Sequence, residues 1–274
     1  MATDTLTTET APAANRAPRA KALPRVLLGL LLPAIVLVAT ETGVRAGWIP
    51  SNLLPAPSEI AGTVFYLAQH GLVGHVAVST ARVTAGFLIG GALAILLGTA
   101  VGLNRRIHAV LDPTFQALRA IPSLAWVPLL LLWLGIDEAP KLVLIAIGAF
   151  FPVYMGVVSG IANADRKLIE VAQLYGLGRI TLARRILLPA ALPAILTGLR
   201  NGLSLAWMFM VAAELIAASR GLGYLLSDGR ETSRADIVLA AIVLLALLGK
   251  ISDSLMALLE NRLLGWRDNY ASPE

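Results

Sequence analysis

The sequence predicts an all-α, polytopic membrane protein with six transmembrane helices, and two observations lead to this fold class. Of the 274 residues, 57% are hydrophobic and only 14% are charged, whereas soluble domains carry about 25% charged residues. The apolar residues are gathered into long blocks, and a helix that spans a bilayer needs roughly 20 mostly apolar residues. No stretch of ordinary soluble composition is long enough to form a second domain.

The apolar blocks define the order of the expected elements. Residues 1–25 are rich in Thr, Ala and Pro, so we expect a disordered cytoplasmic tail there. A transmembrane domain follows over 26–262, and a short cytoplasmic tail over 263–274. The third block is continuous only over 123–134 and must begin near Leu111 to be long enough. The six expected spans are 26–44, 76–103, 111–134, 142–161, 193–218 and 237–259.

The distribution of Lys and Arg predicts the orientation, because cytoplasmic loops carry an excess of these residues. With both termini inside, the opposite side holds five: Arg45, Lys141, Arg220, Arg230 and Arg234. The cytoplasmic side holds fourteen: Arg16, Arg19, Lys21, Arg25, Arg105, Arg106, Arg119, Arg166, Lys167, Arg179, Arg184, Arg185, Arg262 and Arg267. This pattern explains the net charge of +5 without nucleic-acid binding.

Several kinds of chemistry are disfavoured by what the sequence lacks. There is no cysteine, so disulfides and thiolate chemistry are excluded, and the three histidines form no H-E-x-x-H pair. We expect no metal site and no catalytic residues. The phosphate-binding motif G-x-x-x-x-G-K-[ST] is also absent, so we expect no ATP site in this chain.

The long cytoplasmic loop over 162–192 is the most informative segment. Asn163 or Asp165 can cap a helix that Gly176 and Gly178 then end, since glycine readily adopts positive φ. A second short helix is expected over 180–187, ending at Pro189. The result is a helix–turn–helix beneath the membrane with one apolar side, a shape that suits a groove on a partner protein. A loop that merely rests on the lipid interface is the alternative.

The spacing within this loop resembles the cytoplasmic EAA loop of ABC-importer permeases. Three residues separate Ala172 from Gly176, and nine separate Gly176 from Ile186. The one departure is valine in place of the second alanine. The resemblance implies that the loop is the coupling helix that seats in the ATPase. The residues that carry it are Glu170, Val171, Ala172, Gly176, Ile186, Leu188 and Pro189.

Further strings resemble the nitrate/sulfonate/taurine branch of these permeases, most closely the permease subunits for aliphatic sulfonates. They include Leu54-Pro55-Ala56-Pro57, Trp126-Val127-Pro128 and Arg220-Gly221-Leu222-Gly223-Tyr224. The run Ala246-Leu247-Leu248-Gly249-Lys250 with Leu258-Leu259-Glu260 carries the similarity to the sulfonate subunits, whereas the middle strings resemble the taurine subunits about equally. The resemblance implies an inner-membrane permease, paired as a homodimer around a pathway. It also implies two ATPase subunits that bind ATP and Mg²⁺, and a periplasmic or surface substrate-binding protein. Taurine or nitrate are alternative cargoes.

Two other classes of membrane protein agree less well with the sequence. An ion-coupled secondary transporter often shows inverted repeats, but we find no internal repeat, and the loop would be unexplained. A membrane-embedded enzyme would need a nucleophile, base or metal constellation, which the sequence does not offer.

Ionisable residues inside the expected spans are costly and require a reason. Arg200, Ser204, Trp207 and Glu214 fall on one face of the fifth span at helical spacing. They could line a translocation pathway, or they could form an interhelical polar network. The sequence leaves both readings open.

Three other features of the spans are expected to serve packing. Arg82 and Glu214 can form a salt bridge, because both lie near the outer ends of their spans, and Lys250 can pair with Asp253. Small residues spaced four apart let helices approach closely, as in Gly86, Gly90, Gly98 and Gly102. The segment 219–236 could line the outer mouth, contact a binding protein or form an ordinary exposed loop.

Overall fold

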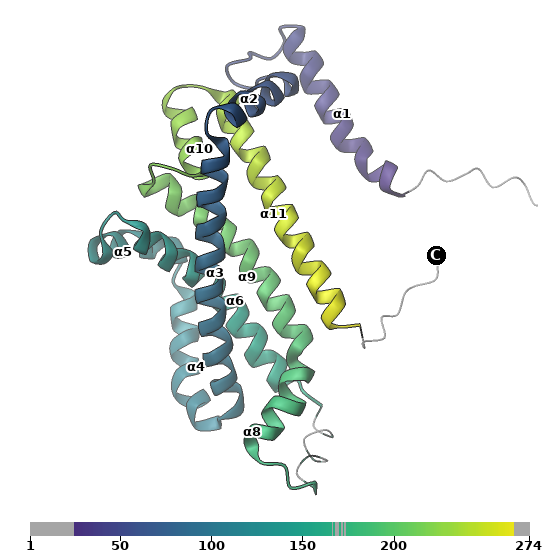
Figure 1. The fold of residues 1–274 in the computed structure, drawn as a ribbon, viewed down its shortest axis with the longest axis vertical. Helices are drawn as coiled ribbons and strands as arrows, with labels where there is room; N and C mark the ends of the chain where they lie inside the picture. The colour runs from purple at the N-terminus through teal and green to yellow at the C-terminus, as the bar shows by residue number, and fades with distance from the viewer. Residues whose placement is uncertain (1–24, 166, 168–169, 171, 173, 266–274) are drawn as a thin grey trace, which may run out of the picture.

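The computed structural model describes residues 25–165, 167, 170, 172 and 174–265, and within them the chain is helical without strands (Figure 1). The helices are α1 (Arg25–Arg45), α2 (Pro57–Gln69), α3 (Leu72–Leu103), α4 (Arg105–Ala120), the 3₁₀ helix η1 (Ser123–Trp126), α5 (Val127–Leu134), α6 (Glu138–Ala162), α8 (Arg179–Leu182), the π-helix η2 (Ala183–Leu187), α9 (Leu188–Ala217), α10 (Leu222–Glu231) and α11 (Ala235–Leu263).

The all-α membrane class is confirmed, but the count of six spans is not. In the part of the chain that the structure describes, four segments are long and apolar enough to cross a membrane: Leu72–Leu103, Glu138–Ala162, Ala183–Ile216 and Ala235–Leu263. These match the second, fourth, fifth and sixth expected spans. The first expected span forms the single helix α1, which is not among the four.

The third expected span is broken rather than straight. Helix α4 and the segment Ser123–Leu134 together have the length and hydropathy of one span, but they meet at an angle of 90°. Pro122 lies between them, and a residue before proline is disfavoured in the α region. Accordingly, Ile121 is extended, with φ −75° and ψ 124°. Pro113 lies inside α4 without ending it.

Helix α3 packs closely along α6, and the expected role of its glycines is confirmed. A side-chain carbon on Gly86 would lie 2.5 Å from Ile145, and one on Gly98 would lie 2.9 Å from Val157. Gly90 faces the backbone of Ala146 so closely that no side chain fits. The missing side chains therefore let the two helices approach each other along several turns.

Helix α9 packs on another side of α6 with an equally close approach. A carbon added to Gly156 would lie 2.6 Å from the carbonyl oxygen of Ala194, and one added to Gly198 would lie 2.8 Å from that of Pro152. Helices α3, α6 and α9 form the centre of the molecule (Figure 1). Their buried residues include Tyr154, whose hydroxyl donates a hydrogen bond of 3.0 Å to Asp112 of α4.

The segment 219–236 is not an ordinary exposed loop. It folds back as α10, which packs against α9 and α11 and buries Leu222 completely. At the same end of the molecule, α2 contacts α11, and Thr63 donates a hydrogen bond of 2.8 Å to Asp236. Helix α1 packs against α2 and stands apart from the central helices (Figure 1).

Candidate functional site

The loop after α6 has the expected helix start and helix end. The backbone N–H of Lys167 donates to the carboxylate of Asp165 at 2.9 Å, so Asp165 rather than Asn163 is the cap. Ala172 is helical and buried. Gly176 has φ +66°, and the N–H of Leu177 donates to the carbonyl of Ala172 at 3.1 Å. This six-residue closure around a left-handed glycine is a Schellman motif.

The turn presents two large apolar side chains. Leu174 is 86% exposed and Tyr175 is 81% exposed. Glu170 is helical and exposed, and Val171, the departure from the family pattern, lies outside the described residues. An exposed apolar tip held by a fixed turn is typical of a surface that docks into a partner.

The second half of the loop differs from the prediction at Pro189. The short helix begins at Arg179, becomes a π-helix over Ala183–Leu187 and continues directly into α9. Pro189 lies in the first turn of α9. Backbone N–H groups in a first turn have no intrahelical partner, so the lack of an N–H in proline costs no hydrogen bond there. The helix therefore does not end at Pro189. Ile186 and Leu188 are half-buried on this continuous helix.

The first part of the predicted stripe of α9, Arg200 and Trp207, contacts α11. The guanidinium of Arg200 donates to Asp253 of α11 at 2.9 Å, and the indole N–H of Trp207 donates to Ser252 at 2.9 Å. Ser204 is exposed and donates to the carbonyl of Arg200. These contacts are those of the interhelical network, and a pathway role for this face stays a prediction. Arg200, rather than Lys250, is the nearer partner of Asp253; the Lys250 ammonium lies 3.9 Å away.

Glu214 belongs to a buried network at the other end of α9, and the predicted salt bridge to Arg82 is confirmed. Glu214 is 1% exposed, and its carboxylate lies 2.7 Å from the Arg82 guanidinium. It also accepts hydrogen bonds from Ser79 at 2.8 Å and from the N–H of Gly223 at 2.8 Å. Arg82 also pairs with Glu138, which Lys141 contacts at 3.2 Å. Two positive and two negative groups thus balance one another.

Gly221 holds the segment before α10 against this network, which leads to a prediction. Gly221 has φ +130° and ψ 174°, a region that only glycine adopts readily, and any side chain there would overlap the Glu214 carboxylate. We expect Gly221→Ala to lower the stability of the purified protein by about 2 kcal/mol or more. Gly62→Ala is the matched control: Gly62 lies in α2 with open space around it. There, alanine should stabilise by roughly 0.5–1 kcal/mol. Thermal unfolding in detergent measures both, and equal shifts of Tm would contradict the prediction.

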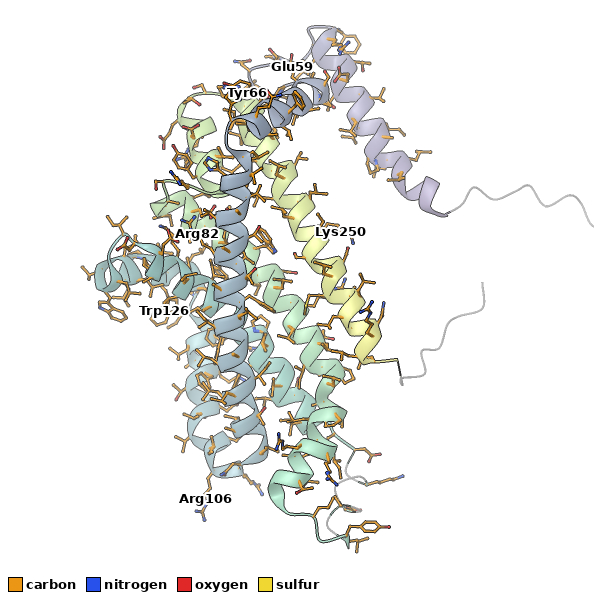
Figure 2. All side chains as sticks on the ribbon, in the orientation of Figure 1. Glu59, Tyr66, Arg82, Arg106, Trp126 and Lys250 are labelled. Atoms are coloured by element: carbon orange, nitrogen blue, oxygen red, sulfur yellow. The ribbon has the colours of Figure 1, made fainter. Side chains whose placement is uncertain are left out.

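One arginine of the charge count, Arg119, lies at a bend within a candidate span rather than in a loop. Arg119 was counted with the cytoplasmic arginines, but it lies in the last turn of α4, next to the 90° bend. It is 14 residues from Arg105, which corresponds to about 21 Å of helix. Figure 2 places Arg106 at the far end of α4 and Trp126 just beyond the bend. The extended third span beginning near Leu111 already contained Arg119, and this was the signal that could have identified it. Removing it from the count leaves the predicted orientation unchanged.

Arg119 lines a hollow of about 650 Å³ between the α4–η1 bend, α6 and α9. The other polar side chains that line it are Ser123, Ser159, Thr197 and Asn201. The rest of the lining is apolar or glycine and includes Phe151, Met155 and Phe209. This hollow lies on a different face of α9 from the contacts of Arg200. Among the described residues, no group of three or more His, Cys, Asp or Glu side chains could hold a metal ion.

Comparison with known proteins places the chain in a family. The profile of a family described as "Binding-protein-dependent transport system inner membrane component" matches residues 77–265. The provisionally named aliphatic sulfonates transport permease protein SsuC of Bacillus subtilis is 42% identical over 88% of each chain. Its namesake in Escherichia coli is 41% identical over 87% of this chain and 91% of its own.

Two further similarities are weaker. The taurine transport system permease protein TauC of Escherichia coli is 34% identical over 88% of this chain and 90% of its own. A solved structure of the MetNI methionine ABC transporter in inward-facing conformations superposes with a TM-score of 0.63 and 20% identity. The superposition covers 72% of this chain and 97% of the matched chain. At this identity the superposition shows a shared fold.

Proposed function

The chain belongs to the family of binding-protein-dependent transport system inner membrane components, and we propose that it forms the pathway by which an ATP-driven importer takes up aliphatic sulfonates. The observation that carries the cargo is the identity of 41–42% along nearly nine-tenths of the chain to two relatives named for sulfonates. Taurine, itself a sulfonate, is the second candidate because of the similarity to TauC. The sequence offered two readings of the Arg200–Trp207–Glu214 face of α9, a pathway wall or a helix seam, and its contacts with α11 and α3 support the seam.

The importer would need subunits that this chain does not supply. We propose that two ATPase subunits bind ATP and Mg²⁺ and drive transport, that a substrate-binding protein delivers the cargo, and that two copies of this chain pair around the pathway. This chain itself would carry out no catalysis. In support, the phosphate-binding motif is absent from the sequence.

The loop from Glu170 to Pro189 is the proposed contact with the ATPase. Three features support this role: the exposed Leu174 and Tyr175 at its tip, the fixed turn at Gly176, and its direct continuation into α9. A partner that moves the tip would therefore move a helix that reaches across the membrane.

The cargo can be tested by growth. A strain that lacks this gene and has no second sulfonate importer should fail to grow with ethanesulfonate as its only sulfur source. It should grow normally on sulfate, and a plasmid copy of the gene should restore growth. Normal growth on ethanesulfonate combined with failure on taurine would favour the taurine alternative. Failure to grow on nitrate as the nitrogen source would point to nitrate, the third candidate cargo.

The topology can be tested by labelling, because the natural chain has no cysteine. We propose that both termini are cytoplasmic. Single cysteines introduced by Thr8→Cys and Ser272→Cys should be protected from membrane-impermeant thiol reagents in intact cells, whereas one introduced by Ser227→Cys in α10 should react. Reaction at both termini would show that both lie outside the cell, opposite to the proposed topology. Reaction at one terminus only would show that the number of spans is odd.

A further inference from the structure

The hollow at the α4–η1 bend has an unbalanced positive charge. Arg119 is the one charged side chain in its lining, and in the described part of the chain its guanidinium makes no hydrogen bond or ion pair. Two arginines inside candidate spans, Arg82 and Arg200, differ from it. Arg82 contacts Glu138 and Glu214, and Arg200 contacts Asp253 and Glu260. A cation in a cleft without a counter-ion attracts an anion.

The position of Arg119 along the molecule makes this charge costly. Helix α4 and the segment after it form one bent candidate span, and Arg119 lies just before the bend. An ionisable side chain partway across a span commonly faces a water-filled cavity and marks a substrate or ion pathway. Arg119 lies partway along a bent candidate span, and its exposed side chain lines the hollow.

The neighbouring polar groups are not equally available to a ligand. The hydroxyls of Thr197 and Ser159 donate to carbonyls of their own helices at 3.0 Å and 2.6 Å. In contrast, the side chains of Ser123 and Asn201 make no hydrogen bond among the described residues. The guanidinium of Arg119, the hydroxyl of Ser123 and the amide of Asn201 are therefore donors that a ligand can use.

These donors match the chemistry of an organic sulfonate. The sulfonate group carries a permanent negative charge and three acceptor oxygens, and a guanidinium fork suits such oxyanions. Phe151, Met155 and Phe209 supply apolar surface for the alkyl part. The volume of about 650 Å³ is within the range of about 300–1,000 Å³ for small-molecule sites. A single charge attracts an anion without holding it, as conduction requires.

We propose that this hollow is a transient sulfonate site on the translocation pathway, with Arg119 binding the sulfonate oxygens and Asn201 and Ser123 donating to them. The proposal rests on the proposed function of the chain as a sulfonate permease. It assigns the pathway to the α4, α6 and α9 surface rather than to the Arg200 face of α9.

The first test is transport by the purified complex, reconstituted into proteoliposomes with its ATPase and binding protein. We expect Arg119→Gln to slow ATP-driven uptake of labelled ethanesulfonate about tenfold, and Arg119→Lys, which keeps the charge, to retain most of it. Arg106→Gln is the matched control, because Arg106 is exposed on the same helix and points away from the bundle (Figure 2). It should transport as the natural protein does. Uptake by Arg119→Gln equal to that of Arg106→Gln would overturn the proposal.

The second test separates an anion site from a structural role. A cysteine introduced by Asn201→Cys should react several-fold faster with an anionic thiosulfonate reagent than with a cationic one of the same size. Adding Arg119→Gln should remove this preference, and ethanesulfonate should slow the reaction only when Arg119 is present. An unchanged preference in the double variant would overturn the proposal even if uptake fell.

The two proposals fail in different ways. If the natural complex moves no ethanesulfonate while it moves another cargo, the proposed function fails. If the natural complex moves ethanesulfonate and both Arg119 variants move it as fast as the natural complex does, only the proposed site at the bend fails.

Discussion

Exchange of Gly176 for valine is expected to abolish most ATP-driven uptake while leaving the membrane helices inserted. Gly176 has φ +66°, and the Schellman closure from Leu177 to Ala172 depends on this conformation. A left-handed conformation costs an ordinary residue about 1–2 kcal/mol, and a β-branched residue is more strongly disfavoured. Valine would therefore turn the chain elsewhere and displace Leu174 and Tyr175, the side chains proposed to meet the ATPase. We expect uptake to fall roughly tenfold or more, since 1.4 kcal/mol corresponds to a factor of ten.

The chain offers a matched control two residues away. Gly178 has no positive φ, and a side chain there would meet nothing within 4 Å. Gly178→Ala should therefore keep normal uptake, and Gly176→Asn, which tolerates the left-handed region, should retain part of it. Uptake and ATP hydrolysis should be measured in the same proteoliposomes. If Gly176→Val retains coupled hydrolysis and uptake, the assignment of the loop to coupling is wrong.

Loss of Arg82 is expected to produce the largest fall in stability. Arg82→Met would leave the carboxylate of Glu214, which is 1% exposed, without its positive partner. Removing one member of a buried ion pair typically costs about 3–5 kcal/mol, because a charge stays buried without compensation. For a chain of this size, this corresponds to a fall in Tm of roughly 6–20 °C in detergent solution.

A second substitution should recover much of the loss. In the double variant Arg82→Met with Glu214→Met no lone carboxylate is buried, so it should be more stable than Arg82→Met alone. Arg45→Gln is the control, because Arg45 is 70% exposed in its pair with Glu41, and such pairs contribute about 0–1 kcal/mol. Strictly additive effects of the two methionines would show that Arg82 and Glu214 do not act as a pair.

Local signals in the sequence predicted much of the fold and of the loop. Gly176 lies where a helix must end, and Gly86 with Gly90, like Gly98 with Gly102, has the four-residue spacing of a close helix contact. Each of these signals depends only on nearby residues. The expected third span ran through Pro122 without a break. The 90° bend there depends on how α5 packs against α6, and hydrophobic periodicity carries no information about that packing.

The surroundings of individual polar residues could not be predicted in the same way. Arg200 and Glu214 fall on one face of an isolated helix, yet α9 is long enough to meet α11 at one end and α3 at the other. A charge count by loop placed Arg119 with the cytoplasmic arginines, but such a count could not show that it lines the hollow between α4, α6 and α9. In both cases the partner helix, which is distant in sequence, decides what the residue does.

The glycine contacts between α6 and α9 have a mechanical consequence. With backbone packed on backbone at Gly156 and Gly198, neither helix can slide along the other without a steric clash, so the pair behaves as one stiff lever. Its lower end is continuous with the loop through the π-helix at Ala183–Leu187. The 30 residues of α9 span about 45 Å, so a tilt of about 10° at the loop would sweep the opposite end through roughly 8 Å. A small displacement at the loop is thereby amplified at the opposite end of α9.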